Sequence, residues 1–124
     1  LNRKMDASLV KDALTKALST RFPVKDLTFH SDQGAQYKSN EVSKLLEVMN
    51  IRQSMSRRGN CWDNAVAESF FKTIKHEFIK HQSFEGVSDA KSKIFEWIET
   101  FYNRKRLHSS LGFLSPEEYE LKIT

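Results

Sequence analysis

The stretch LTFHSDQGAQY, residues 27–37, indicates the fold better than any other because its character changes halfway along. Leu27 to His30 is short and largely apolar, and the turn-forming residues Asp-Gln-Gly follow almost at once. A brief apolar run that ends in a turn predicts a short buried strand. Asp32 then lies just past the carboxyl end of this strand, a position that suits either a turn or chemistry.

Apolar residues recur at helical spacing on both sides of this strand. That spacing predicts one helix over residues 6–19 with Asp6 or Ser8 as cap, one after a cap at Ser39, one that Asp63 or Asn64 caps, and one that starts at Ser88. Phe22-Pro23 is expected to end the first helix, and residues 51–56 alternate loosely like a second strand. Ser115-Pro116-Glu117-Glu118 combines a capping box with a proline, which predicts a short last helix. Two strands among about five helices predict an α/β fold with a thin sheet.

Length and composition favour a single domain over residues 1–124. With 39% hydrophobic residues, a chain of 124 residues can bury one modest core. The net charge of +4 suits a polyanionic partner without demonstrating one. Cys61 is the only cysteine, which excludes an internal disulfide, and no apolar run approaches a membrane span. We therefore expect a cytoplasmic protein, and because the first residue is Leu1 rather than Met, a piece of a longer one.

Two carboxylates are the candidates for chemistry. A carboxylate at a strand end and another on a helix are a common way to hold Mg²⁺, and Asp32 and Glu68 have these positions. Phosphodiester cleavage and transfer use such ions, and they need hard oxygen ligands. The plainer interpretation is that Asp32 makes a turn and Glu68 is a solvated helix residue. Spacing alone favours the plainer interpretation, because such carboxylate pairs are abundant.

Three other kinds of site fit the sequence less well. A hydrolase triad of His30, Ser31 and Asp32 is implausible, since adjacent side chains on a strand point to opposite faces. His76 and His81 have no third soft ligand nearby, which argues against zinc. A glycosidase would also use two carboxylates, but the aromatic residues fall on helical core stripes and leave no platform for a sugar.

Three stretches together carry a resemblance to a known family. They are HSDQGAQY (residues 30–37), RRGNCWDNAVAESFFKTIKHE (residues 57–77) and YNRKRLHSSLGFLSPEEYE (residues 102–120). In this order they resemble the second aspartate motif, the glutamate motif and the tail of insertion-sequence transposases of the OrfB type. These enzymes belong to the retroviral-integrase-like superfamily with an RNase H-like fold. Thirty-five residues, 33–67, separate Asp32 from Glu68, the interval that describes this class.

The resemblance implies a metal-dependent DNA transposase, in which water or a DNA 3′-hydroxyl attacks a phosphodiester. Asp32 and Glu68 would be catalytic and would ligate Mg²⁺ or Mn²⁺. The residues that would contact DNA are Lys75 and Lys72 on the glutamate helix, Arg57 and Arg58 in a mobile loop, Asn64 at the helix start, and Arg104, Arg106 and His108 in the tail. The alternatives are solvated cations, a cap at Asn64, and a tail in which Tyr102 and Leu107 simply pack.

One departure from the family is serious. The family's first catalytic aspartate lies on an earlier strand, and no residue between Leu1 and Asp26 can replace it. We therefore expect an incomplete RNase H-like fold that lacks its first three strands, with an RNase H-like part up to about residue 102 and a basic tail over 103–124. Two carboxylates alone hold Mg²⁺ poorly, so this chain by itself is expected to be inactive.

The missing strands also leave an edge of the sheet bare. We expect a homo-oligomer, such as a dimer that pairs residues 27–30 of two copies. The leading hypothesis is part of a transposase core that acts on transposon ends and target DNA near the nucleoid. The competing hypothesis is a noncatalytic DNA-binding or assembly module, and an RNA-cleaving nuclease is disfavoured by the tail.

Overall fold

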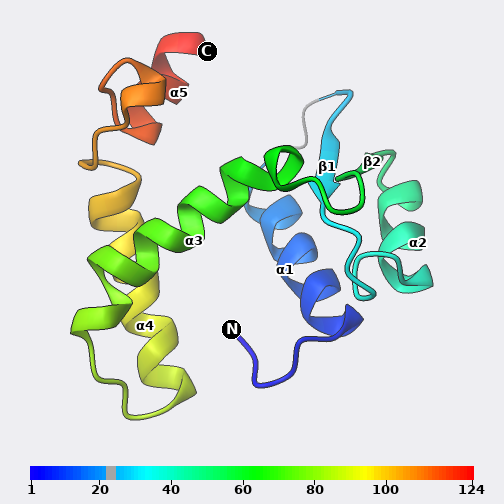
Figure 1. Cartoon of the computed structure of the whole chain (residues 1–124), viewed down its shortest axis with the longest axis horizontal. Helices are drawn as coiled ribbons and strands as arrows, with labels where there is room; N and C mark the ends of the chain where they lie inside the picture. The colour runs from blue at the N-terminus through cyan, green and yellow to red at the C-terminus, as the bar shows by residue number, and fades with distance from the viewer. Residues whose placement is uncertain (22–24) are drawn as a thin grey trace. The chain divides into compact units, whose positions relative to one another are not determined.

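The structure, a computed structural model, describes residues 1–21 and 25–124 (Figure 1). In these residues the main elements are α1 (Ala7–Thr20), β1 (Thr28–Ser31), α2 (Asn40–Val48), β2 (Arg52–Met55), α3 (Ala65–Glu77), α4 (Val87–Trp97) and α5 (Pro116–Ile123). The α/β prediction with two short strands and five helices is confirmed for the described residues. The predicted helix end at Phe22-Pro23 lies outside them.

The described residues group into two compact units, residues 1–73 and 74–124. The boundary falls within α3, so its first residues belong to the first unit and its last residues to the second. The single-domain organisation stays a prediction. Within the described residues no helix has the length and apolar character needed to cross a membrane.

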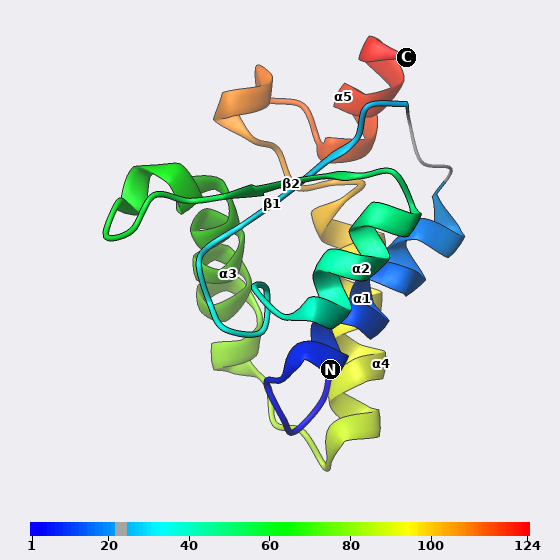
Figure 2. The same cartoon turned by 90° about the vertical axis from the view of Figure 1, so that its right-hand side faces the viewer.

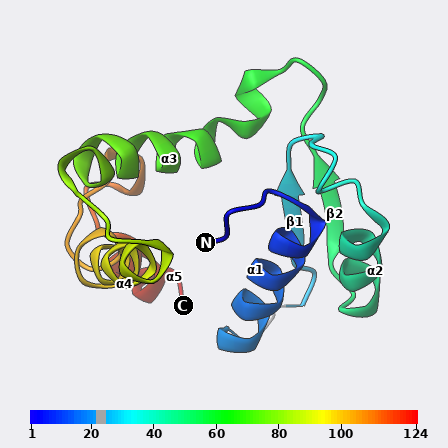
Figure 3. The ribbon, with the colours of Figure 1, turned by 90° about the horizontal axis from the view of Figure 1, so that it is seen from below.

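The first unit is built around a parallel pair of strands. β1 pairs with β2 in a register that sets Thr28 opposite Arg52 and Ser31 opposite Met55. Figures 1 and 3 show α1 beside β1 and α2 beside β2. Because the strands are parallel, the residues that follow them emerge at the same edge of the sheet. Asp32 and Ser56 are therefore brought to one edge.

A small apolar cluster holds the two helices of this unit together. Val42, Leu46 and Ile51 are buried at its centre, and the partly buried side chains that pack on them are Val10, Leu14, Leu18 and Phe29. α1 and α2 contact each other (Figure 2). Asp6 caps α1 by accepting from the Leu9 N–H, and Ser39 caps α2 by accepting from the Val42 N–H, as predicted.

The start of α3 differs from the prediction. A 3₁₀ turn, Cys61–Asn64, precedes α3, and the side chain of Asn60 caps it by accepting from the N–H groups of Trp62 and Asp63. The prediction that Asp63 or Asn64 caps this helix is wrong because both lie inside the helical run. The carboxylate of Asp63 bonds to Arg57 instead.

Aromatic rings pack against one another in the second unit. α4 begins at Val87, one residue before the predicted start, and continues as a π-helical turn over Ile98–Tyr102. The rings of Phe78 and Trp97 stack with centroids 5.4 Å apart. The predicted capping box of α5 is confirmed, since Ser115 and Glu118 exchange backbone-to-side-chain hydrogen bonds.

Candidate metal and DNA site at the edge of the sheet

A tight turn fixes the side chain of Asp32 where the chain leaves β1. Its Oδ1 accepts from the Gly34 N–H at 2.7 Å. A Cβ at position 34 would lie 2.9 Å from this same oxygen, which is closer than real Cβ contacts allow. Glycine is therefore needed at position 34 for this carboxylate position. The turn predicted as the plainer interpretation of Asp32 is present, and it leaves the side chain exposed.

Asp32 and Glu68 line the same open depression, of about 360 Å³, in the first unit. Its other walls come from Gln33, Asn64 and the loop residues 56–61. Asp32 reaches it from the end of β1, and Glu68 reaches it from the first turn of α3. Among the described residues no group of three or more His, Cys, Asp or Glu side chains forms a metal-binding cluster. The carboxylates that this part of the chain brings to the depression are therefore these two.

Ser56 ties together the segments that leave the two strands. It is 5% exposed. Its N–H donates to the Ser31 carbonyl at 2.8 Å, and its carbonyl accepts from the side-chain amide of Gln33 at 3.1 Å. These bonds extend the strand pairing by one residue and keep the turn that holds Asp32 against the neighbouring segment.

The ring of His30 connects β1, β2 and the turn before α3. Nδ1 lies 2.9 Å from the Ser54 hydroxyl, and Nε2 lies 2.9 Å from the Asp63 carbonyl and 3.1 Å from the Ser56 hydroxyl. Because a carbonyl oxygen only accepts, Nε2 carries the hydrogen, and in the neutral ring Nδ1 accepts from Ser54. The histidine therefore fixes the loop that leads to Glu68, and the Ser31 hydroxyl donates elsewhere, to the Asp32 carbonyl.

The loop at residues 57–63, which contains two arginines, is closed by an ion pair between Arg57 and Asp63. The guanidinium of Arg57 donates to both carboxylate oxygens of Asp63, at 2.8 and 2.9 Å, and the Arg57 N–H donates to the same group. These hydrogen bonds hold the pKa of Asp63 far below its usual range, and they raise the pKa of Arg57. Arg57 is therefore engaged with Asp63, whereas Arg58 is exposed on the same loop.

The remaining candidates for DNA contact lie on α3 and on the 3₁₀ turn before it. Asn64 lines the depression. Lys72 and Lys75 are exposed on the helix that carries Glu68. Their contact with DNA stays a prediction.

The tail candidates are engaged within the second unit. Arg106 donates to both carboxylate oxygens of Glu77, at 2.8 and 2.7 Å, and this pairing lowers the pKa of Glu77. The ring of His108 packs edge-on against Tyr102 with centroids 5.1 Å apart, and burial lowers the pKa of His108. Arg104 lies 3.6 Å from a Glu117 oxygen and is largely exposed.

The plainer interpretation of the tail holds for one of its two residues. Tyr102 packs as described, but Leu107 is 56% exposed and is not a packing residue within the described chain.

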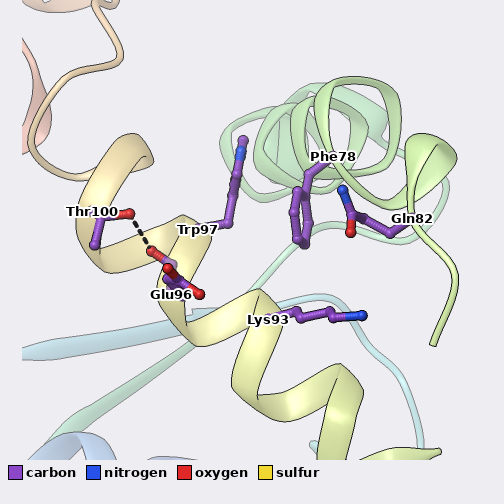
Figure 4. Close-up of a pocket in the computed structure, with 6 residues that line it drawn as sticks. All are labelled: Phe78, Gln82, Lys93, Glu96, Trp97 and Thr100. Carbon is purple, nitrogen blue, oxygen red and sulfur yellow. Dashed lines mark hydrogen bonds between the residues drawn. The ribbon is translucent and has the colours of Figure 1, made fainter. Parts of the chain in front are cut away.

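A second depression, of about 360 Å³, lies in the second unit (Figure 4). The stacked rings of Phe78 and Trp97 face each other there, and the Thr100 hydroxyl donates to the Glu96 carbonyl at 2.6 Å. Glu96 is the one carboxylate among its lining residues in the described structure. This second depression therefore lacks the pair of carboxylates found at the edge of the sheet.

Sequence reasoning did not identify His30, Ser54, Ser56 and Asn60 as parts of this site. The partners of His30, Ser54 and Ser56 lie on other segments, so periodicity carries no signal for these three, whereas Asn60 caps the turn that directly follows it. Polar residues at the ends of two adjacent parallel strands were the available indication, because those ends meet at one edge.

Comparison with known proteins gives consistent matches over the chain. Family models described as an integrase core domain match residues 1–61 and 49–116. The transposase for insertion sequence element IS904 of Lactococcus lactis subsp. lactis (strain IL1403) is 42% identical over 120 residues, which are 97% of this chain and 47% of that protein. Transposase InsF for insertion sequence IS3A of Escherichia coli (strain K12) is 41% identical over 122 residues, 98% of this chain and 42% of that protein.

A solved structure is similar in fold. The catalytic core domain of BIV integrase matches with a TM-score of 0.69 and 21% identity, over 98% of this chain and 75% of that one. This likeness agrees with a partial RNase H-like fold. The chain spans less than half of the length of the two transposases it matches.

Proposed function

Because this chain belongs to the integrase core domain family of insertion-sequence transposases, we propose that it is part of a core for DNA transposition and integration. In the parent protein, Asp32 and Glu68 bind Mg²⁺ or Mn²⁺ for DNA cleavage and strand transfer. The observation that supports this proposal is that both carboxylates line one open depression although 35 residues separate them.

The residues at the depression fit a divalent metal in kind but are few in number. Carboxylate oxygens are the ligands that Mg²⁺ and Mn²⁺ prefer, and an open site leaves room for water and a phosphate oxygen. When bound, such ions lower the pKa of the attacking hydroxyl and neutralise charge on the leaving oxygen. Two carboxylates fall short of the octahedral ligand set, so the chain by itself binds the metal weakly and is inactive.

The protein's own groups have separate tasks in this proposal. The turn through Gly34 orients Asp32, and His30 holds the loop that leads to Glu68. Arg58 and Asn64 contact the DNA backbone beside the depression, while Lys72 and Lys75 contact it along α3. Arg57 adds its charge to the same loop while it is paired with Asp63.

Arg104, Arg106 and His108 form the proposed tail contact with DNA. Of these, Arg104 has the side chain best placed to reach a phosphate, because it is 63% exposed and its pairing with Glu117 is loose.

The competing function is a noncatalytic DNA-binding or assembly module, and mutation in the parent protein separates the two. Asp32→Asn and Glu68→Gln should abolish strand transfer and spare DNA binding. Asp12→Asn and Glu41→Gln, which change exposed carboxylates on α1 and α2, are matched controls and should retain both. Equal loss of binding and transfer in the first pair would favour the binding module instead.

We also propose that two copies associate through the outer edge of β1. Among the described residues β1 pairs only with β2, so its other edge presents backbone groups to solvent. The Leu27 carbonyl accepts from the Arg52 N–H, so the Thr28 N–H on the same peptide points outward. Thr28→Pro removes that donor and should turn a dimer into a monomer in a sedimentation experiment. A wild-type chain that stays monomeric at high concentration would contradict the proposal.

A further inference from the structure

Trp62 is unusual among the aromatic residues because it is almost fully in solvent. It is 83% exposed, whereas the other tryptophan, Trp97, stacks on Phe78 within the second unit. Tryptophan is enriched at binding interfaces because its large flat ring provides much contact area. Val66, one helical turn further along, is 88% exposed and provides an internal comparison.

The backbone at Trp62 is fixed from three directions. The Asn60 side chain accepts from the Trp62 N–H at 3.0 Å and from the Asp63 N–H at 3.3 Å. Arg57 holds the Asp63 carboxylate, and His30 holds the Asp63 carbonyl. The indole is therefore presented by an ordered turn, and a ligand that binds it need not order the loop first.

Trp62 is not a lining residue of the depression that contains the two carboxylates, but residues close to it on both sides in the chain are. Cys61, immediately before it, and Asn64, two residues after it, both line this depression, and so does Arg58 earlier in the loop. An aromatic face, an exposed guanidinium and two carboxylates thus occur within one small region. Base, phosphate and metal-bound oxygen are the parts of a nucleotide that these three groups recognise.

We propose that Trp62 stacks on an unpaired base of the DNA strand whose phosphodiester lies at Asp32 and Glu68. A stacking contact needs only the flat face of the base, so it tolerates different sequences and requires no array of hydrogen-bond donors. A paired base inside a duplex hides that face, so the contact selects a frayed or single-stranded end. This inference rests on the proposed function, because it assumes that the depression receives DNA.

The test compares two DNAs on this 124-residue chain. One is a fully paired duplex, and the other is the same duplex with a short unpaired overhang that carries 2-aminopurine. Wild-type chain should bind the overhang DNA more tightly and change the 2-aminopurine fluorescence. Trp62→Ala should weaken binding of the overhang DNA by about five- to a hundredfold and leave the paired duplex nearly unchanged. Trp62→Phe should retain most of the binding, because phenylalanine also stacks.

Val66→Ala is the matched control, since it removes a similarly exposed apolar side chain one helical turn further along and should have no effect on either DNA. Circular dichroism checks that each variant is folded. Equal weakening of both DNAs by Trp62→Ala, or no weakening of either, would overturn the stacking role. A loss of self-association without a change in DNA binding would also overturn it and would identify Trp62 as a protein contact.

The failure of this inference can be told apart from failure of the proposed function. If wild-type chain binds neither DNA, the proposed function fails and the inference fails with it. If Asp32→Asn in the parent protein abolishes strand transfer while the fluorescence response to the overhang persists, both the catalytic role of Asp32 and the separate stacking role of Trp62 are supported.

Discussion

The loop at residues 57–63 and the tail at residues 102–108 have similar basic sequences, but their arginines differ in the structure. Arg57 forms an ion pair with Asp63, and the Arg57 side chain is 75% exposed. Arg106 forms an ion pair with Glu77, but the Arg106 side chain is only 24% exposed. Around Arg106 lie Tyr102 and His108, which add burial to the pair. The same kind of charged pair therefore lies on the surface of the first unit and in a partly buried position in the second unit.

The largest expected difference between the two pairs is in stability. Arg106→Ala leaves Glu77, whose side chain is 38% exposed, without its partner and should lower the free energy of unfolding of the second unit by about 1 kcal/mol. Lys105→Ala, a change to an exposed cation next in the chain, is the control and should be nearly neutral. Urea unfolding followed by Trp97 fluorescence in a Trp62→Phe background measures both. An unchanged midpoint for Arg106→Ala would show that the pair is as superficial as the one in the loop.

The second-largest expected difference is in how the stability of each unit responds to acid. The pKa of His108 is lowered by burial, so its contribution to stability is present above the ordinary value of about 6.5 and is lost as the pH falls below it. The pKa of Glu77 is lowered by Arg106, so its contribution is lost as the pH falls below about 4.3. The second unit should therefore weaken in two steps. The pKa of Asp63 is lowered by its hydrogen bonds to Arg57, so its contribution to stability is lost only as the pH falls below about 3.9.

NMR signals from each unit across a pH titration test this order. Simultaneous loss of signals from both units between pH 6.5 and 4.3 would contradict it.

Freeing Arg57 in the loop from its carboxylate partner should strengthen DNA binding, whereas freeing Arg106 in the tail should not. Asp63→Asn weakens the hold on Arg57 and removes a negative charge beside the depression, so affinity for duplex DNA at low salt should rise several-fold. Glu77→Gln releases Arg106 into a partly buried setting and should not raise it. Fluorescence anisotropy over a range of salt concentrations distinguishes these outcomes. Equal gains from both substitutions would mean that a released Arg106 strengthens the tail contact as much as a released Arg57 strengthens the loop contact.

The smallest expected effect is on the motion of the loop. His30→Ala removes the bond to the Asp63 carbonyl, so the amide hydrogens of Trp62 and Asp63 should exchange faster while the fold is kept. His81→Ala, at an exposed histidine in the second unit, should leave these two amides unchanged. Unaltered exchange in the His30 variant would show that Asn60 and Arg57 hold the turn without the histidine.

The helices and strands could be predicted because their signals are local in the sequence. Most of the features that the sequence did not predict depend on contacts between distant segments. Ser115 and Glu118 are three residues apart, so their capping box is visible in the sequence. The strand before Asp32 was visible for the same reason. The wrong cap at the start of α3 arose because Asp63 is drawn to Arg57 and Asn60 takes its place, a competition between side chains that local propensity does not describe.

The candidate site shows the same division. Asp32 and Glu68 were candidates from their places at a strand end and on a helix, but spacing alone favoured an ordinary turn and a solvated helix residue, and the family resemblance made the catalytic role the leading hypothesis. The hydrogen bonds of His30 join residues 24 to 33 positions apart, and no periodic pattern encodes such contacts. Only the folded chain brings the ends of β1 and β2 and the start of α3 together.

A titration of the chain with Mn²⁺, followed by NMR, tests whether the carboxylates of Asp32 and Glu68 share one divalent ion. A shared ion predicts that paramagnetic broadening appears at both residues over the same range of Mn²⁺ concentration, and that Asp32→Asn reduces the broadening at Glu68 as well. Broadening at the two residues over different concentration ranges, with Glu68 unaffected by the loss of the Asp32 charge, would contradict a common metal site.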